Sequence, residues 1–336
     1  MLGAGSWGTA VATICAGSAP TVLWARRSEL AAEICTQHRN RAYLPDLELP
    51  SALEATASIS DAVAGAGLLV MAVPSHGFRD ILGQAAPCVD PDVPVISLAK
   101  GLEQGSFMRM TEISGEVLPG HHAGVLTGPN LAREVVAGQP TASVVAVEDG
   151  QLAQEVQLLL STDTFRVYTN DDVVGCEIAG ALKNVIAIAA GMADGMGFGD
   201  NSKAALITRG LAELARLGVA MGGNPLTFAG LAGMGDLVAT CISPQSRNRH
   251  VGHELGRGRT IGEVIAEMNM VAEGVKTAPS VLELAGRHGV EVPIVEQVVE
   301  VLSGRKTARQ IIPALMRRQA KPELHGLDLQ DVADRF

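Results

Sequence analysis

The chain has 336 residues, and a typical domain size of roughly 150 residues predicts two domains. Its formal net charge of −10 argues against a broad nucleic-acid or anionic-membrane surface, because such a surface needs an excess of Lys and Arg. We therefore expect no nucleic-acid partner, and any contact with a phosphate should be local.

The cysteines and histidines give no sign of a disulfide framework or a metal site. The five cysteines lie far apart, are odd in number and form no C-x-x-C pair, so we expect reduced thiols. The eight histidines lack companion ligands at metal-binding spacing. No uninterrupted apolar run reaches 18 residues, and the N-terminus has no basic segment before an apolar one. The sequence predicts a cytoplasmic protein without a metal or an integral membrane segment.

Residues 1–170 alternate short runs rich in Val and Ile with amphipathic stretches of helical length. This pattern is typical of a parallel sheet with crossover helices, so we expect an α/β, Rossmann-like N-terminal domain. Ligands of such sheets bind beyond the carboxyl ends of the strands, which makes the loops after them candidate sites. The predicted strands are Thr21–Trp24 and residues 68–73, 93–99, 123–126, 143–147 and 165–168.

The first motif is Gly3-Ala4-Gly5-Ser6-Trp7-Gly8, a complete G-x-G-x-x-G followed by a helical stretch, residues 9–16. Its glycines allow a tight turn and a close approach of the backbone to a pyrophosphate, and the helix N-terminus offers free N–H groups to the anion. Strand Thr21–Trp24 follows at the spacing of a βαβ unit. This context favours a dinucleotide site over an ordinary glycine-rich turn.

Only Met1 and Leu2 precede the first glycine, whereas a strand normally has about five residues. The sequence therefore predicts a truncated first strand, and our hypothesis is that the natural chain begins further upstream.

Cofactor choice is normally read just after the second strand, where NAD enzymes carry an Asp or Glu for the ribose 2′-hydroxyl. Arg26 and Arg27 occupy this place here. A pair of guanidinium groups suits the 2′-phosphate of NADP, so we predict a preference for NADP(H), with NAD(H) as a second cofactor. The alternative is that both are ordinary solvated arginines.

Residues 171–336 are rich in Ala, Leu and Gly at helical spacing and predict an all-helical C-terminal substrate domain that ends in a loosely held tail, residues 321–336. Lys183 and Asn184 stand in a helix that is otherwise apolar nearly all round. An unpaired ammonium is costly to bury, so Lys183 either reaches solvent along its stem or points into a polar cleft as a catalytic acid or base.

Two further polar segments follow in this domain. The loop Ser243-Pro244-Gln245-Ser246-Arg247-Asn248-Arg249 feeds a helix and could bind a single phosphate through side chains and free N–H groups. Asp236, after Gly233-Met234-Gly235, could accept a hydrogen bond from a substrate hydroxyl, or it could simply cap a helix.

Seven motifs follow one another along the chain: Gly3-Ala4-Gly5-Ser6-Trp7-Gly8, Val73-Pro74-Ser75, Ala99-Lys100-Gly101, Gly128-Pro129-Asn130, residues 177–184, residues 230–237 and Ser246-Arg247-Asn248. Taken together, these motifs resemble bacterial NAD(P)-dependent glycerol-3-phosphate dehydrogenase, from Gly3 to about Pro313. The resemblance implies a Rossmann-like domain, a helical domain, a homodimer, and reduction of dihydroxyacetone phosphate to sn-glycerol 3-phosphate for glycerophospholipid biosynthesis.

The resemblance also implies residue roles. Lys183 would donate and accept the proton, and the substrate would contact Lys100, Gly128, Asn130, Lys183, Asp236, Ser246, Arg247 and Asn248. The cofactor would contact Gly3, Gly5, Ser6, Trp7, Gly8, Arg26, Arg27, Lys100, Ala132, Arg247, Val271 and Glu273. Two alternatives stay open at this point: a related hydroxyacid or sugar-acid phosphate dehydrogenase, whose substrate carries a carboxylate, and a non-catalytic dinucleotide-binding sensor.

Overall fold

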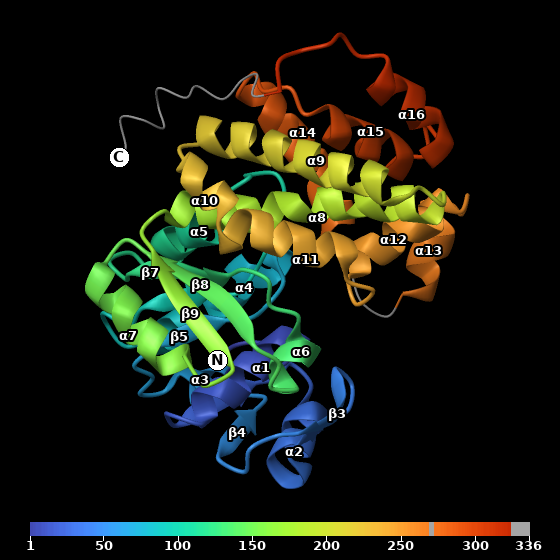
Figure 1. The fold of residues 1–336 in the computed structure, drawn as a ribbon. Coiled ribbons are helices and arrows are strands. Elements are labelled where there is room, and N and C mark those ends of the chain that lie inside the picture. The colour runs from blue at the N-terminus through green and yellow to red at the C-terminus, as the bar shows by residue number, and fades with distance from the viewer. Residues whose placement is uncertain (269–271, 324–336) are drawn as a thin grey trace. The chain divides into compact units, whose positions relative to one another are not determined.

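The computed structural model describes residues 1–268 and 272–323 (Figure 1). By its internal contacts the chain divides into two compact units, Met1–Val173 and Val174–Phe336. Val271 and most of the expected tail, residues 321–336, lie outside the described residues.

The first unit is built on a five-stranded sheet in the order β5-β6-β7-β8-β9. Apolar residues on it alternate between two clusters, with Val70 and Ile96 in one and Leu69, Met71 and Val95 in the other, as expected when both faces of a sheet are covered. These strands span Leu69–Met71, Val95–Ser97, Ala123–Thr127, Thr141–Val147 and Phe165–Asn170.

The sequence pattern predicts a parallel sheet, but the observed sheet is mixed. β7 and β8 pair antiparallel, whereas β5–β6, β6–β7 and β8–β9 pair parallel. The segment between β7 and β8 contains only the five-residue helix α6, Ala132–Val136. Such a helix is about 7.5 Å long, roughly half the length of the five-residue strand before it, so it does not carry the chain back to the start of β7.

Met1 and Leu2 take the place of a central strand in the sheet. Leu2 forms parallel bridges both to Trp24 of β1 (Thr21–Trp24) and to Met71 of β5. Leu2 N–H donates to Val70 O at 2.8 Å, and Leu2 O accepts from Ala72 N at 2.7 Å. The pair β1–β4, with β4 at Leu53–Thr56, is thereby joined to the five-stranded sheet, and the glycine turn that follows has a strand on each side.

The remaining elements of this unit are helices and a small hairpin. The hairpin β2–β3 was not predicted, because its residues Arg39–Asn40 and Leu44–Glu48 lack the Val, Ile and aromatic residues that mark strands. The helices are α1 Ser6–Ala16, α2 Ser28–Gln37, α3 Ile59–Val63, α4 Ser75–Ala85, α5 Met110–Val117, α6 and α7 Gly150–Leu160, with a 3₁₀ turn at Ala86–Cys88.

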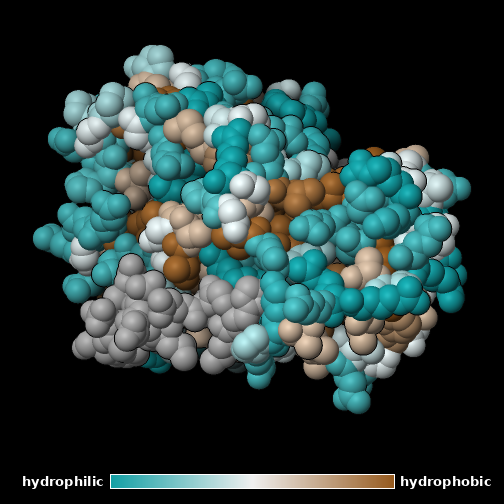
Figure 2. Space-filling model, turned by 90° about the horizontal axis from the view of Figure 1, so that it is seen from above, coloured by the Kyte–Doolittle hydropathy of each residue, from teal (hydrophilic) through white to brown (hydrophobic). Residues whose placement is uncertain are grey.

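The described part of the second unit consists of helices and turns, which confirms the predicted fold class. One described helix, α8 at Val173–Gly195, is long and apolar enough to cross a membrane, but 94% of its most apolar window is buried inside the protein. The face seen in Figure 2 is largely hydrophilic, with hydrophobic residues, shown in brown, gathered in patches. The other helices are α9 Asp200–Ala220, α10 Pro225–Ala229, a π-helical turn Leu231–Gly235, α11 Asp236–Ile242, α12 Arg247–Gly256, α13 Ile261–Glu267, α14 Glu273–Arg287, α15 Pro293–Leu302 and α16 Ala308–Met316.

Helices α8 and α12 touch through their main chains. A Cβ atom built on Gly191 of α8 would lie 2.1 Å from Arg249 O, and one on Gly252 of α12 would lie 2.0 Å from Ile188 O. Side chains larger than a hydrogen atom therefore do not fit at this crossing.

Candidate active site

The predicted site residues fall into two groups, one in each unit. In the first unit, the glycine turn has one open position. A Cβ on Gly3, where φ is +122°, would lie 2.6 Å from Ala72 O, and one on Gly8 would lie 2.0 Å from Gly3 O. A Cβ on Gly5 would meet nothing within 4 Å. Gly3 and Gly8 are thus required by the fold, whereas Gly5 borders free space just before α1, which suits a pyrophosphate.

The two residues after Gly5 are partly buried. Ser6 Oγ donates to Tyr43 O at 3.3 Å, and the Trp7 ring packs at a tilt on Phe165, with 6.1 Å between ring centroids. The indole Nε1 of Trp7 is buried, and no described residue accepts its hydrogen. An unused buried donor next to the glycine turn is the kind of group that a bound ligand would satisfy.

Arg26 and Arg27 are solvent-exposed at the end of β1, and neither side chain has a hydrogen-bond or ion-pair partner within the described ranges. Arg27 occupies the N-cap position of α2 without a side-chain cap bond. The geometry leaves both guanidinium groups free to bind a phosphate, and it equally fits two solvated arginines.

Lys100, Gly128 and Asn130 are brought together by the loops after β6 and β7. Lys100 Nζ donates to Gly128 O at 2.9 Å and to Asn130 Oδ1 at 2.5 Å. The buried Nδ2 of Asn130 has no partner among the described residues, so the amide keeps a donor available. Ala132 begins α6 two residues later. Because β6 and β7 are neighbouring parallel strands, their carboxyl ends lie at the same edge of the sheet, so the approach of the two loops follows from the strand order.

In the second unit, the Lys183 ammonium is buried and paired. Its side chain is 5% exposed, forms an ion pair with Asp236 and donates to Thr240 Oγ1 at 2.8 Å. Thr240 Oγ1 in turn donates to Asp236 O at 2.6 Å. Lys183 therefore does not escape to solvent, and it is not the solitary cation that its apolar helix suggested.

Asp236 is 2% exposed and does not cap α11, whose N-cap residue is Gly235. Asp236 and Thr240 stand four residues apart, which places them on one face of α11. Sequence reasoning did not single out Thr240; the signal was this i, i+4 spacing from a candidate carboxylate. Burial raises the pKa of the neighbouring Cys241 thiol to about 12, so the thiol is neutral beside the pair.

Asn248 joins three helices. Its Nδ2 donates to Asn184 Oδ1 of α8 at 2.8 Å, and its Oδ1 accepts from Gly274 N of α14 at 2.9 Å. Asn184 Oδ1 therefore accepts a hydrogen bond from α12. Glu273, a predicted cofactor contact, begins α14 beside this bond. The network fixes the start of α12 relative to the helix that carries Lys183.

Ser246 and Arg247 begin the same helix. The Ser246 side chain accepts from Arg249 N at 3.2 Å as the N-cap, and Arg247 is exposed at the first helical position. Arg249 pairs with Asp194 of α8. Of the two arginines of this loop, Arg247 is the exposed one at the helix N-terminus, which is where an anion would be stabilised.

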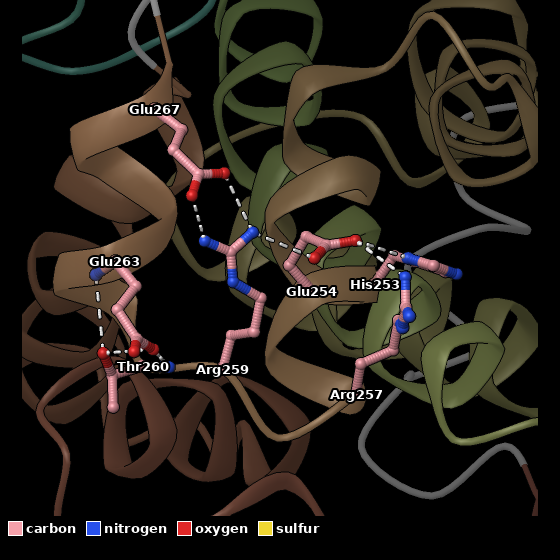
Figure 3. A network of polar contacts seen from close by, with 7 residues as sticks. All are labelled: His253, Glu254, Arg257, Arg259, Thr260, Glu263 and Glu267. Carbon is pink, nitrogen blue, oxygen red and sulfur yellow. Dashed lines mark hydrogen bonds and ion pairs between the residues drawn. The ribbon is translucent and has the colours of Figure 1, made fainter.

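The far end of α12 is held by a charge network (Figure 3). Arg259 donates to Glu254 at 3.2 Å and to Glu267 of α13 at 2.6 Å, and Thr260 with Glu263 forms a capping box at the start of α13. Within residues 1–268 and 272–323, no cluster of three or more His, Cys, Asp or Glu side chains could hold a metal ion.

A dinucleotide-type glycine turn on a Rossmann-like sheet, followed by a helical unit with a buried lysine, defines a two-domain nicotinamide-dependent dehydrogenase. Comparison with known proteins narrows this class. The models for the N- and C-terminal domains of NAD-dependent glycerol-3-phosphate dehydrogenase match residues 1–153 and 172–313. The chain belongs to this family.

Individual proteins similar to this chain carry the name of the same family. The chain is 57% identical to glycerol-3-phosphate dehydrogenase [NAD(P)+] 2 of Sphingopyxis alaskensis, with 97% of this chain and 98% of the relative covered. It is 52% identical to glycerol-3-phosphate dehydrogenase [NAD(P)+] of Mycobacterium avium, with 97% and 96% covered. The crystal structure of the Coxiella burnetii glycerol-3-phosphate dehydrogenase matches with a TM-score of 0.90 at 37% identity, over 94% of this chain and 98% of that one.

Proposed function

We propose that the protein reduces dihydroxyacetone phosphate to sn-glycerol 3-phosphate with NADPH, and also with NADH, and so supplies glycerophospholipid biosynthesis. The observation that carries the proposal is the buried Lys183–Asp236–Thr240 cluster in a chain of this family. The experiment below is designed so that a hydroxyacid dehydrogenase and a non-catalytic sensor would each give a different result.

The glycine turn and the two arginines after β1 are the core of the proposed cofactor site. The open position at Gly5 and the N-terminus of α1 fit a pyrophosphate, with Gly3 and Gly8 shaping the turn and Ser6 and Trp7 beside it. Arg26 and Arg27 are proposed to bind the 2′-phosphate of NADP(H). Lys100, Ala132, Arg247, Val271 and Glu273 complete the proposed cofactor set.

A second set of residues is proposed to bind the substrate. Arg247, with Ser246 and Asn248 at the start of α12, is proposed to bind the substrate phosphate, where a guanidinium and free N–H groups both favour an anion. Lys100, Gly128, Asn130 and Asp236 are proposed to contact the glycerone part of the substrate.

When bound, the reduced nicotinamide supplies the hydride. Negative charge then grows on the ketone oxygen, and the ammonium of Lys183 stabilises this charge and supplies the proton at Nζ. Asp236 and Thr240 keep Nζ in place, because both accept its hydrogens. The phosphate contacts hold the ketone in one orientation, so binding energy is converted into positioning.

The test follows the absorbance of reduced nicotinamide after dihydroxyacetone phosphate is added to the purified protein with NADPH or NADH. Turnover with this ketone, and none with 2-keto acids of similar size, is the expected result. We expect Lys183→Ala to lower kcat by about 10³-fold or more while the Kd for NADPH stays unchanged, because proton transfer and charge stabilisation are both lost.

The matched control is Lys306→Ala, which removes a partly exposed ammonium that bonds Gln297 and pairs with Glu300. It should leave kcat and KM as they are. Near-normal turnover of Lys183→Ala would exclude this lysine as the proton donor, and binding of NADPH without any turnover would favour the sensor.

We further propose that the enzyme is a cytoplasmic homodimer. Light scattering coupled to size exclusion tests the mass directly: about 70 kDa supports the dimer, since one chain has a mass of 34.8 kDa. A species of single-chain mass at assay concentration would overturn it.

A further inference from the structure

One buried amide outside the motifs contacts the glycine turn. Asn40, in the hairpin strand β2, is 0% exposed. Its Nδ2 donates to Ala4 O at 3.0 Å and to Thr9 Oγ1 at 2.8 Å. A carbonyl oxygen only accepts, so the bond to Ala4 fixes which end of the amide faces the turn.

These two bonds reach both sides of the open position at Gly5. Ala4 directly precedes it, and Thr9 lies in the first turn of α1, where its N–H donates to Gly5 O at 2.9 Å. A backbone carbonyl facing a pyrophosphate would repel it, whereas N–H groups attract it. The Asn40 amide donates to the Ala4 carbonyl oxygen, and so it stabilises the conformation of the turn in which this oxygen faces the protein and not the pyrophosphate.

The same hairpin contacts the turn a second time. Tyr43, between β2 and β3, accepts from Ser6 Oγ at 3.3 Å. The hairpin itself is closed by the bond from Leu49 N to His38 O at 2.8 Å. The turn is therefore supported from a segment more than 30 residues along the chain, not only by its own glycines.

We propose that Asn40 is a positioning residue for the dinucleotide: it holds the glycine turn in the form that accepts a pyrophosphate, without touching the cofactor itself. The inference rests on the cofactor site proposed above. Substitution of Asn40 should weaken the binding only of ligands that carry a pyrophosphate. A general role of Asn40 in folding would instead affect all ligands.

The experiment compares Asn40→Asp, Thr9→Val and the control Asn170→Asp by NADPH fluorescence titration and steady-state kinetics. Asn40→Asp keeps the shape but replaces both donors with an acceptor, so the Kd and KM for NADPH should rise about 10-fold or more. Thr9→Val removes one acceptor and should raise both about 3-fold. The kcat at saturating NADPH and the KM for dihydroxyacetone phosphate should stay within about 2-fold. The control also exchanges an amide for a carboxylate in the first unit, but Asn170 uses its Oδ1, which accepts from Asp172 N at 2.8 Å, so it should change nothing.

Two ligand fragments sharpen the result. ADP-ribose, which has a pyrophosphate, should lose affinity for Asn40→Asp as NADPH does, whereas 2′-AMP, which has none, should keep it. Equal losses for both fragments, or an unchanged Kd for NADPH in a folded Asn40→Asp protein, would overturn the proposal. If Asn40→Asp does not fold, Asn40→Ser and Thr9→Val are judged by the same criterion. Because these titrations need no turnover, a failure of the proposed reaction would be seen separately.

Discussion

The two units build their candidate sites from different parts of the chain. In the first unit the proposed cofactor site consists mainly of main-chain atoms around Gly3, Gly5 and Gly8, which lie close together in sequence. In the second unit the central group is a side-chain ammonium, whose partners Asp236 and Thr240 are 53 and 57 residues away. A backbone site depends on which positions lack a side chain, whereas a buried ion pair depends on both of its members. Substitutions in the two units should therefore affect stability and ligand binding in different ways.

The largest effect is expected at the buried pair. Lys183→Met leaves the Asp236 carboxylate buried without its cation, so it should lower the free energy of unfolding by about 3–5 kcal/mol. Lys183→Met with Asp236→Leu removes both charges and should regain most of that stability, yet remain inactive. Urea denaturation of the two variants, with Lys306→Met as the control, measures this. Equal stabilities of the single and double variants would show that the ion pair is not coupled.

In the glycine turn, one substitution should mainly lower stability and another should mainly weaken NADPH binding. Gly8→Ala forces a Cβ against Gly3 O and should cost about 3 kcal/mol of unfolding free energy, because the contact is with backbone. Gly5→Ala adds a methyl group in open space, so stability should change by less than about 0.5 kcal/mol while the Kd for NADPH rises about 10-fold. Thermal unfolding and fluorescence titration provide the two readouts. A Gly5→Ala protein with unchanged NADPH affinity would contradict the assignment of this position.

A smaller, pH-dependent effect is expected at Glu213 of α9, a buried carboxyl that accepts from Ile294 N at 2.8 Å and Val295 N at 3.3 Å. Burial raises its pKa from 4.5 to about 7, more than the helix N–H groups and Arg216 lower it. A raised carboxyl pKa gives stability that is complete below pH 4.5 and is lost as the pH rises through 7.

Glu213→Gln removes this dependence and keeps an acceptor. The difference in unfolding free energy, wild type minus variant, should therefore fall by at most about 3 kcal/mol between pH 4.5 and 7.5. Urea denaturation across this range checks it, with the exposed Glu283→Gln as control. A difference that stays constant with pH would mean that Glu213 titrates normally.

Sequence reasoning reached the features that depend on neighbours along the chain. β1 was predicted with the bounds that the structure has, and the glycine turn and the helical second unit followed from local patterns. The partners of Lys183 could not be predicted, because an apolar helix gives no information about which distant carboxylate packs on it. Asn40 escaped notice for the same reason: its two hydrogen bonds join segments 31 and 36 residues apart.

The crossing of α8 and α12 has a consequence for the distance between Lys183 and the start of α12. Because Gly191 and Gly252 bring main chain against main chain, the spacing between Lys183 and the start of α12, where the substrate phosphate is proposed to bind, is set by backbone geometry and not by replaceable side chains. Ordinary core substitutions then leave this spacing unaltered. Alanine or serine at either glycine would push the two helices apart, so we expect a homologue with such a residue to hold Lys183 and the start of α12 at a different distance.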